Sequence, residues 1–320
     1  MHPRLIMETR FDVLVIGGAN YDYLVTGPRL PRPGETVVGT MLSEAPGGKG
    51  ANQAIGAARL GARTAFVGKV KDDQLGRAFT HDIRASGVAF DTKPAASGPS
   101  TARCYIIVTP DGERTMNTYL GAAQDLYPTD IQDDAIAAAA ITYLEGYLWD
   151  PPQAKEAFVK AASIAHKNGR KVALTLSDAF CVDRYRDEFL KLIRDKTVDI
   201  VFANERELHS LYQTGDFDSA LSAVKGDASL AVITRSEKGC VVVSGGKTEA
   251  VPAAPIRNVV DATGAGDLFA AGFLVGHSKE MSLRDAARLG AIAAAEIIQH
   301  VGARPEASLK ELVAENGLKI

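Results

Sequence analysis

The chain has 320 residues, of which 46% are hydrophobic, so it can bury a large core as one domain with an appendage or as two domains. Its formal net charge is -3 and no basic block stands out, which argues against a nucleic-acid partner. The three cysteines lie far apart without a CxxC pair, which is typical of free thiols in a reducing compartment.

No stretch of the sequence approaches the length of about 18 apolar residues that a membrane span requires. The first ten residues, MHPRLIMETR, contain only a short apolar run before charged residues return, too short for a secretory signal. We interpret them as a leader before the first strand. The sequence therefore predicts a cytoplasmic protein with no membrane partner.

Strands and helices alternate along the chain. The first predicted strand is the β-branched run FDVLVIGG at 11–18, and a helix follows at 51–62, where Gly61 is expected to end it. Further strands are predicted at 64–70, 141–148, 171–177, 198–204 and 229–235, and further helices at 74–88, 152–169 and 183–195. This alternation predicts a mainly parallel sheet covered by helices on both faces.

Two stretches break the alternation. Residues 21–48 contain short alternating segments interrupted by prolines, and residues 101–120 contain two strand-like runs around Pro110-Asp111-Gly112, which predicts a hairpin. We expect both to form a small separate sheet, inserted at about 20–46 and 97–120 of a single domain that spans 1–320. No repeat, low-complexity tract or flexible linker is present.

The segment DATGAGD, Asp261–Asp267, places small residues between two acids, directly before the apolar run LFAAGFLVG. Small residues at a helix start leave backbone N–H groups exposed, and these groups together with the helix dipole bind anions such as phosphate. A carboxylate at Asp267 could accept a proton from an attacking hydroxyl beside that anion. The alternative is that Asp267 only caps its own helix.

Three motifs resemble signatures of one family, the PfkB (ribokinase-like) carbohydrate kinases. DATGAGDLFAAGF resembles the family's C-terminal signature, DTxGAGDxF, with Ala262 where threonine is common. APGGKGANQAIGAARLGA resembles the N-terminal signature in its ribokinase form, and VFANERE resembles the NxxE element. The motifs occur in the family's order along essentially the whole chain. The resemblance implies an α/β, Rossmann-like ribokinase fold, with a mainly parallel central sheet, helices on both faces and a small β-sheet lid.

The resemblance also implies a reaction, in which the γ-phosphoryl group of ATP passes in line to a hydroxymethyl group. It assigns Asp267 as the general base and Gly264, Ala265 and Gly266 as a backbone anion hole. Asn204 and Glu207 would organise Mg²⁺ through water molecules. For the nucleotide phosphates it implies Thr234, Ser236 and Gly239, and for a possible K⁺ it implies Asp261 and Thr263.

The acceptor is expected at the ends of the early strands, where ligands bind in open α/β sheets. The residues that resemble the ribose-contacting set of ribokinase are Asn20, Asp22, Gly48, Lys49, Asn52 and Glu145. Their side chains include the donors and acceptors that vicinal hydroxyls need. We expect Lys49 to face the hydroxyl groups of the sugar.

The motifs disagree about the substrate. RPGETVVG and GGKGANQA resemble ribokinase, whereas TMNTYLGA, EGYLWDPP and SDAFCVDRYRDEFL resemble bacterial PfkB proteins described as adenosine kinase. We favour a ribokinase-type enzyme that converts ribose to ribose 5-phosphate, with an adenosine or nucleoside kinase as the alternative. A kinase of another sugar or sugar phosphate, and an inactive binding protein, are lesser alternatives. The resemblance to ribokinase also implies a homodimer formed through the lid.

Overall fold

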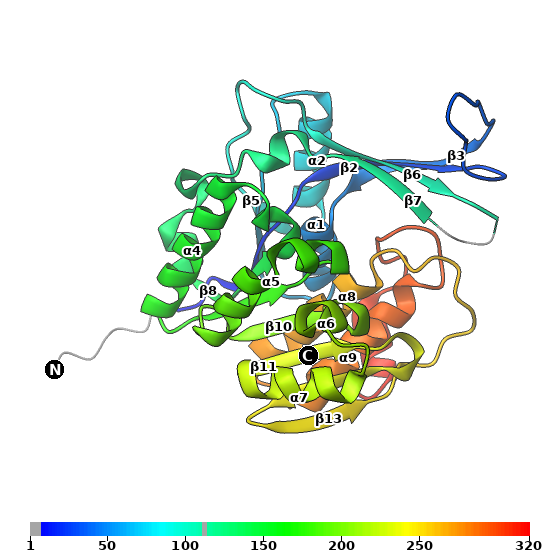
Figure 1. Ribbon diagram of the computed structural model, residues 1–320. Helices are drawn as coiled ribbons and strands as arrows, with labels where there is room; N and C mark the ends of the chain where they lie inside the picture. Colours follow the sequence, from blue (N-terminus) through cyan, green and yellow to red (C-terminus); the bar gives the residue numbers. More distant parts are fainter. Residues whose placement is uncertain (1–7, 111–113) are drawn as a thin grey trace.

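Two separate sheets organise residues 8–110 and 114–320, the part of the chain described by this computed structural model (Figure 1). One is a large, mostly parallel sheet between layers of helices, and the other is a small sheet that extends away from the body. The predicted α/β class, with helices on both faces of the central sheet, is therefore confirmed. The leader residues 1–7 and the predicted turn at 111–113 lie outside the described residues.

The large sheet joins the six predicted strands with three that were not predicted, β5, β12 and β13, in the order β13-β12-β11-β10-β9-β8-β1-β4-β5. Its strands are β1 (Phe11–Ile16), β4 (Thr64–Val67), β5 (Val88–Phe90), β8 (Ala139–Glu145), β9 (Lys171–Thr175), β10 (Ile200–Asn204), β11 (Leu230–Thr234), β12 (Cys240–Ser244) and β13 (Lys247–Val251). All neighbouring strands from β11 to β5 are parallel, whereas β12 and β13 form an antiparallel edge. The carboxyl ends of the parallel strands therefore meet at one edge.

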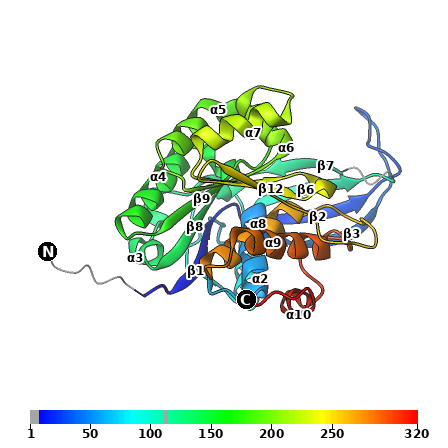
Figure 2. The same cartoon turned by 90° about the horizontal axis from the view of Figure 1, so that it is seen from below.

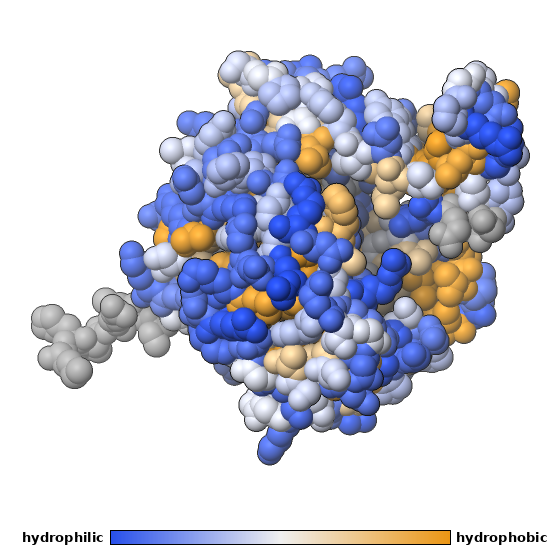
Figure 3. All heavy atoms as spheres, viewed as in Figure 1, coloured by the Kyte–Doolittle hydropathy of each residue, from blue (hydrophilic) through white to orange (hydrophobic). Residues whose placement is uncertain are grey.

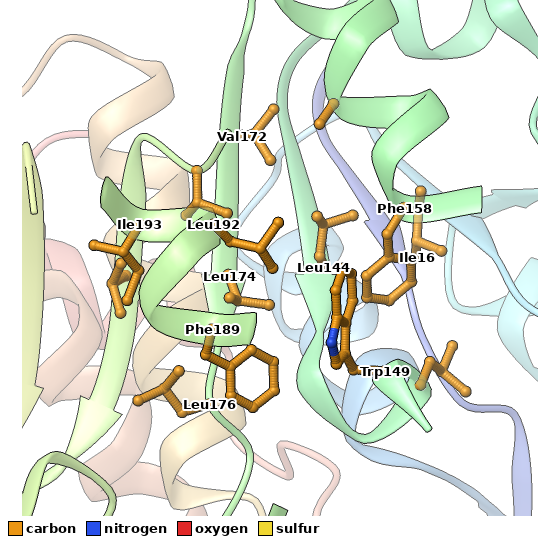
Figure 4. Packing of buried hydrophobic residues seen from close by; sticks show 14 of the residues in the cluster. Ile16, Leu144, Trp149, Phe158, Val172, Leu174, Leu176, Phe189, Leu192 and Ile193 are labelled. Carbon is orange, nitrogen blue, oxygen red and sulfur yellow. The ribbon is translucent and has the colours of Figure 1, made fainter. Parts of the chain in front are cut away.

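Helices cover both faces of this sheet (Figure 2). One layer contains α3 (Asp133–Ala137), α4 (Pro152–Lys167), α5 (Ala179–Arg194), α6 (Glu205–Tyr212) and α7 (Phe217–Asp227). The other contains α1 (Lys49–Arg59), α2 (Gln74–Ala85), α8 (Ala265–Ser278) and α9 (Leu283–Ile297), with α10 (Leu309–Glu315) packed behind α9. In the first layer, Trp149 and Phe158 pack against Leu144 and Phe189 (Figure 4). None of the helices in the described residues has the length and apolar character to cross a membrane.

All four predicted helices have different bounds in the structure, including the one expected at 51–62, which is Lys49–Arg59, and the one expected at 152–169, which ends at Lys167. The helix expected at 74–88 ends at Ala85, because Gly87 adopts a φ of +86° and the chain then enters β5. The helix expected at 183–195 begins earlier, at Ala179, because the Asp178 side chain accepts a hydrogen bond from the Cys181 N–H at 2.6 Å and caps the first turn.

The small sheet, called the lid sheet below, contains β2 (Asn20–Thr26), β3 (Thr40–Gly47), β6 (Ala102–Val108) and β7 (Arg114–Tyr119), in the order β3-β2-β6-β7. The predicted antiparallel pairing of β6 with β7 is confirmed. Its strands alternate between two faces. One face carries Leu24, Cys104 and Ile106 toward the body, and on the other Tyr23 stacks on Tyr105 with ring centroids 5.4 Å apart.

Close packing of α8 against α1 and α9 places the residues of the site. A Cβ atom on Gly56 of α1 would lie 2.5 Å from Cδ1 of Leu268, and one on Gly272 of α8 would lie 2.7 Å from Cα of Gly290 in α9. The helices approach this closely only because glycines lie at the crossings. The start of α1 and the start of α8 consequently lie side by side.

Candidate active site

A cleft of about 710 Å³ separates the lid sheet from the carboxyl edge of the large sheet (Figure 3). Both halves of the predicted site contribute to its walls. The predicted residues that line it are Asn20, Asp22, Gly48, Lys49, Asn52, Glu145, Asn204, Glu207, Thr234, Thr263, Gly264, Ala265, Gly266 and Asp267. Three others, Ser236, Gly239 and Asp261, do not line it.

Asp267 lies at the floor of the cleft, in the first turn of α8. Its Oδ1 atom accepts a hydrogen bond from Nζ of Lys49 at 2.9 Å, and its Oδ2 atom accepts one from Nδ2 of Asn52 at 3.3 Å. Burial disfavours the charge on Lys49, but the attraction of Asp267 outweighs it and raises the pKa of Lys49. Asp267 does not cap α8, because the N-cap residue is Gly264.

The turn before α8 has the geometry expected of an anion-binding loop. Gly264 adopts a φ of +78°, and a Cβ atom there would lie 2.9 Å from Cβ of Ala303, so only glycine fits. The N–H of Ala265 donates to the carbonyl of Ala262 at 3.3 Å, which leaves Gly266 and Asp267 as the helix-start residues whose N–H groups have no partner within α8. Nζ of Lys49 lies 4.0 Å from the position of a Cβ on Gly266, so its positive charge flanks this turn.

Glu145 is the last residue of β8, and its carboxylate joins two backbone segments. Its Oε2 atom accepts the N–H of Gly18 and the N–H of Gly50, each at 2.8 Å. The side chain is buried, and burial raises the pKa of its carboxyl against these hydrogen bonds and the charge of Lys49. Glu145 therefore holds the turn after β1 against the start of α1, in addition to lining the cleft.

Asp22 enters the cleft from the lid sheet, two residues after Asn20. A Cβ atom on Gly47 would lie 2.0 Å from Oδ2 of Asp22, so the carboxylate packs directly on the glycine of β3. Burial raises the pKa of Asp22 to about 6, against the attraction of Arg304 and Arg114. Arg304 also donates to the carbonyl of Pro46 at 2.9 Å, which anchors the end of β3 to the C-terminal loop.

Asn204 and Glu207 cap the start of α6 reciprocally. Oδ1 of Asn204 accepts the N–H of Glu207 at 2.9 Å, and Oε2 of Glu207 accepts the N–H of Asn204 at 3.0 Å. Glu207 is only 4% exposed, so it is not a solvated helix position, and burial raises the pKa of its carboxyl. The described residues contain no group of three His, Cys, Asp or Glu side chains that could hold a metal directly. The carboxylates lining the cleft instead fit a Mg²⁺ ion that keeps its waters.

The end of β11 contributes Thr234 to the cleft, while Ser236 and Gly239 lie in the turn that leads to β12 and do not line it. Gly239 adopts a φ of +82°, and a Cβ atom there would lie 2.1 Å from the carbonyl oxygen of Val251, so packing requires the glycine. Arg235 is not a free surface charge, because it pairs with Glu205 at 3.1 Å.

The surroundings of Asp261 do not form a cage for a cation. Its Oδ1 accepts the N–H of Thr263 at 2.9 Å, and its Oδ2 accepts the N–H of Gly302 at 2.9 Å. Nη1 of Arg114, from the lid sheet, lies 3.5 Å from Oδ1. These neighbours are donors and a positive charge, whereas K⁺ would need oxygen ligands. The predicted K⁺ ligands therefore do not fit that ion in this arrangement.

Several cleft residues have no counterpart in the sequence-based site. Arg114 and Met116 line the cleft from β7, and Tyr147, Asp178 and Phe180 line it beyond β8 and β9. Asp178 could have been found, because it follows the predicted strand at 171–177 and the ends of parallel strands meet at the ligand-binding edge. Arg114 gives no such signal, since its position depends on how the lid sheet lies over α8.

Comparisons with known proteins agree with this architecture. A model of the pfkB family carbohydrate kinases matches residues 10–310. The ribokinase of Haemophilus influenzae is 32% identical over 302 residues, which cover 92% of this chain and 94% of that protein. The adenosine kinase structure from Sinorhizobium meliloti is 48% identical, with a TM-score of 0.89 over 96% of this chain and 100% of that one. A structure of Arabidopsis thaliana ribokinase, complexed with ribose and ATP, is 26% identical, with a TM-score of 0.78 over 96% of this chain and 99% of that one.

The chain belongs to the pfkB family of carbohydrate kinases, as the sequence motifs predicted. It is an ATP-dependent carbohydrate kinase, an enzyme that transfers a phosphoryl group to an alcohol. The family includes kinases of different acceptors, so the acceptor has to be argued from the cleft itself.

Proposed function

We propose that the enzyme transfers the γ-phosphoryl group of ATP to the 5-hydroxymethyl group of a ribofuranosyl substrate. The observation that carries this proposal is the contact of Asp267 with Lys49 and Asn52 at the floor of the cleft, beside the anion-binding turn. A carboxylate, a cation and exposed backbone N–H groups at one point are the groups that phosphoryl transfer to a hydroxyl requires.

Asp267 acts as the general base. It takes the proton of the acceptor hydroxyl as the oxygen attacks the γ-phosphorus, and the bond to the β-phosphate oxygen breaks to release ADP. In the turn formed by Gly264, Ala265 and Gly266, the N–H groups left free at Gly266 and Asp267 bind the transferring phosphoryl group, and Lys49 adds a positive charge beside it. Lys49 also donates a hydrogen bond to Oδ1 of Asp267 and so orients the carboxylate.

The nucleotide occupies the half of the cleft near Asn204 and Thr234, where the ends of β10 and β11 meet α8. Thr234 is the candidate phosphate contact, and Ser236 and Gly239 shape the turn behind it. Glu207 and Asn204 would hold Mg²⁺ through its waters. Mg²⁺ neutralises charge on the phosphate oxygens when it is bound. The ribokinase complex with ATP, similar in fold and sequence, supports ATP as the donor.

Free ribose is the first candidate acceptor. Asn20, Asp22, Lys49 and Asn52 place polar groups around the acceptor half of the cleft, as a sugar with several hydroxyls needs. The similarity to ribokinases over nearly the whole chain supports this candidate.

A nucleoside is the second candidate acceptor, and the cleft wall favours it. Tyr147, Leu148 and Phe180 line the cleft beyond Glu145, and Phe180 leaves 68% of its surface exposed. Exposed aromatic and apolar surface of this kind suits a flat base attached to C1 of the sugar. The 48% identity to the adenosine kinase of Sinorhizobium meliloti supports the same candidate.

One assay separates the candidates. ADP release would be measured with ribose, adenosine, other nucleosides, fructose 6-phosphate and related sugars, on wild type and on Phe180→Ala. A preference for adenosine that Phe180→Ala abolishes supports the nucleoside, and a preference for ribose that Phe180→Ala leaves unchanged supports the free sugar. Absence of acceptor-dependent ADP release with all of them would refute the proposed reaction.

We also propose a cytoplasmic homodimer formed through the lid sheet. Apolar side chains are exposed on the lid sheet, on the segment before β3 and on the loop before α8, among them Val38, Met41, Leu42, Val259 and Val260 (Figure 3). A second copy would cover such surface. The free thiols of Cys104, Cys181 and Cys240, all buried, suit a reducing compartment.

A further inference from the structure

Arg114 connects the lid sheet to the loop that leads into α8. It is the first residue of β7 and lines the cleft on the same face as Met116 and Thr118. Its Nη1 atom lies 3.5 Å from Oδ1 of Asp261, with side chains only 23% and 10% exposed. Among the described residues, Nη1 has no hydrogen-bond partner although it is buried. Asp261 is thus the carboxylate at ion-pair distance from Arg114, whose charge also attracts Asp22.

Asp261 in turn holds the anion-binding turn in place. Its carboxylate accepts the N–H of Thr263, which directly precedes Gly264, and the N–H of Gly302 from the C-terminal loop. The next residue of that loop, Ala303, packs against Gly264. The side chain of Asp261 therefore links the backbone that enters α8, at Thr263, to the C-terminal loop, at Gly302.

A buried carboxylate that has only neutral donors around it is costly, and a cation at ion-pair distance offsets that cost. Desolvation alone would raise the pKa of Asp261, but the hydrogen bonds from Thr263 and Gly302 and the charge of Arg114 lower it. Because Arg114 belongs to the lid sheet, its charge reaches Asp261 only when that sheet lies over the cleft.

We propose that Arg114 is a positioning residue, whose guanidinium group serves as the counter-ion of Asp261 and so couples the position of the lid sheet to the shape of the anion-binding turn. The inference rests on the proposed phosphoryl transfer, since it is this transfer that gives the turn its role. It also assigns to a side chain the positive charge that a monovalent cation would otherwise have to supply at Asp261.

The test compares Arg114→Gln, Arg114→Lys, Asp261→Asn and the double variant Arg114→Gln/Asp261→Asn with wild type. Arg32→Gln is the matched control, because Arg32 is an exposed arginine of the segment between β2 and β3. We expect Arg114→Gln to lower kcat about tenfold, with a smaller effect on the KM of the acceptor. Because both single variants break the same ion pair, the kcat of the double variant should not fall below that of the less active single variant. Arg114→Lys should retain most of the activity.

Two further measurements separate positioning from substrate contact. Hydrogen exchange of the peptide that covers residues 258–268 should be faster in Arg114→Gln than in wild type, without any substrate present. Replacing Na⁺ by K⁺ should stimulate Arg114→Gln and leave wild type nearly unchanged, because a small cation can then approach Asp261.

Three results would overturn the inference: additive effects of the two single variants, unchanged hydrogen exchange, or a wild type that depends on K⁺ as strongly as Arg114→Gln does. A rise in acceptor KM alone would make Arg114 a substrate contact instead. If wild type releases no ADP with any acceptor, the proposed function fails, and the exchange measurement still decides whether Arg114 positions the turn.

Discussion

Nζ of Lys49 and Oδ1 of Asp267 lie 2.9 Å apart, although 218 positions separate the two residues in the chain. The contact joins the glycine-rich turn before α1 to the first turn of α8. The sequence predicted that Lys49 would face the hydroxyl groups of a sugar, but in the structure its ammonium group binds the carboxylate proposed as the base. Lys49 is therefore expected to affect the chemical step for every acceptor.

Lys49→Met should lower kcat by about 10- to 100-fold with both ribose and adenosine, because it removes the positive charge beside Asp267 and the anion-binding turn. The measurement is steady-state kinetics with each acceptor. Lys69→Met is a suitable control, because it removes a largely buried ion pair in which Nζ of Lys69 lies 2.6 Å from Oδ1 of Asp130. Lys69 does not line the cleft, so this variant should leave kcat unchanged. A selective rise in the KM of ribose, with kcat preserved, would instead indicate a direct sugar contact.

Asp267→Asn should abolish most of the turnover and keep nucleotide binding. Loss of a positioned general base costs about 10²- to 10⁴-fold in rate, whereas the backbone N–H groups of the turn remain. The experiment pairs turnover assays with calorimetric titration of ATP, after thermal unfolding has shown that the variant is folded. A kcat close to that of wild type would exclude Asp267 as the base.

Glu207→Gln should increase the Mg²⁺ concentration needed for half-maximal activity and leave the acceptor KM nearly unchanged. The carboxylate oxygens of Glu207 accept hydrogen bonds from the backbone N–H of Asn204 at 3.0 Å and from its Nδ2 at 2.7 Å. In the variant, the NH₂ group of the amide would face one of these two donors, and that hydrogen bond would be lost. We expect a stability loss of about 1–3 kcal/mol as well. A lower stability with an unchanged Mg²⁺ titration would mean that Glu207 only caps α6.

Asp22→Asn should stabilise the folded protein at pH 7. Burial raises the pKa of Asp22 from 3.8 to about 6. Between about pH 4 and about pH 6, the folded state therefore keeps a proton that the unfolded state has released. The free energy of unfolding of wild type therefore falls as the pH rises from about 4 to about 6 through this residue. We expect Asp22→Asn to be more stable by on the order of 1–3 kcal/mol at pH 7 and to lose that advantage below pH 4.

Urea unfolding of wild type and Asp22→Asn at several pH values between 4 and 7 checks this prediction. A difference that stays constant over the range would show that the titration of Asp22 does not contribute.

The oligomeric state can be measured directly. Light scattering at micromolar concentration should give the mass of a homodimer, and Met41→Glu, which places a charge on exposed apolar surface of β3, should shift it toward the monomer. A monomeric wild type would contradict the proposed lid-mediated dimer.

Six strands of the large sheet and the floor of the cleft could be predicted from the sequence, because β-branched runs, helical spacing and glycine-rich turns are local patterns. The short β5 and the antiparallel edge strands β12 and β13 were not predicted. The family motifs then pointed to the residues that the structure gathers around Asp267. Local patterns do not show which distant backbone groups a side chain meets. Glu145 was recognised as a strand-end carboxylate, but its hydrogen bonds to Gly18 and Gly50 depend on how three elements pack together. Arg114 was missed for the same reason.

The separation of the two sheets has a consequence for how such enzymes diversify. The four strands of the lid sheet come from two short stretches of chain, β2 and β3 from 20–47 and β6 and β7 from 102–108 and 114–119, while Asn204 and Asp267 belong to the large sheet and the helix beneath it. Changes in those two stretches that retain Arg114 can therefore remodel the upper wall of the cleft without displacing Asn204 or Asp267. Under the proposed function, acceptor preference and phosphoryl chemistry can be inherited separately, and a graft of both stretches that keeps Arg114 is a direct route to exchanging the acceptor.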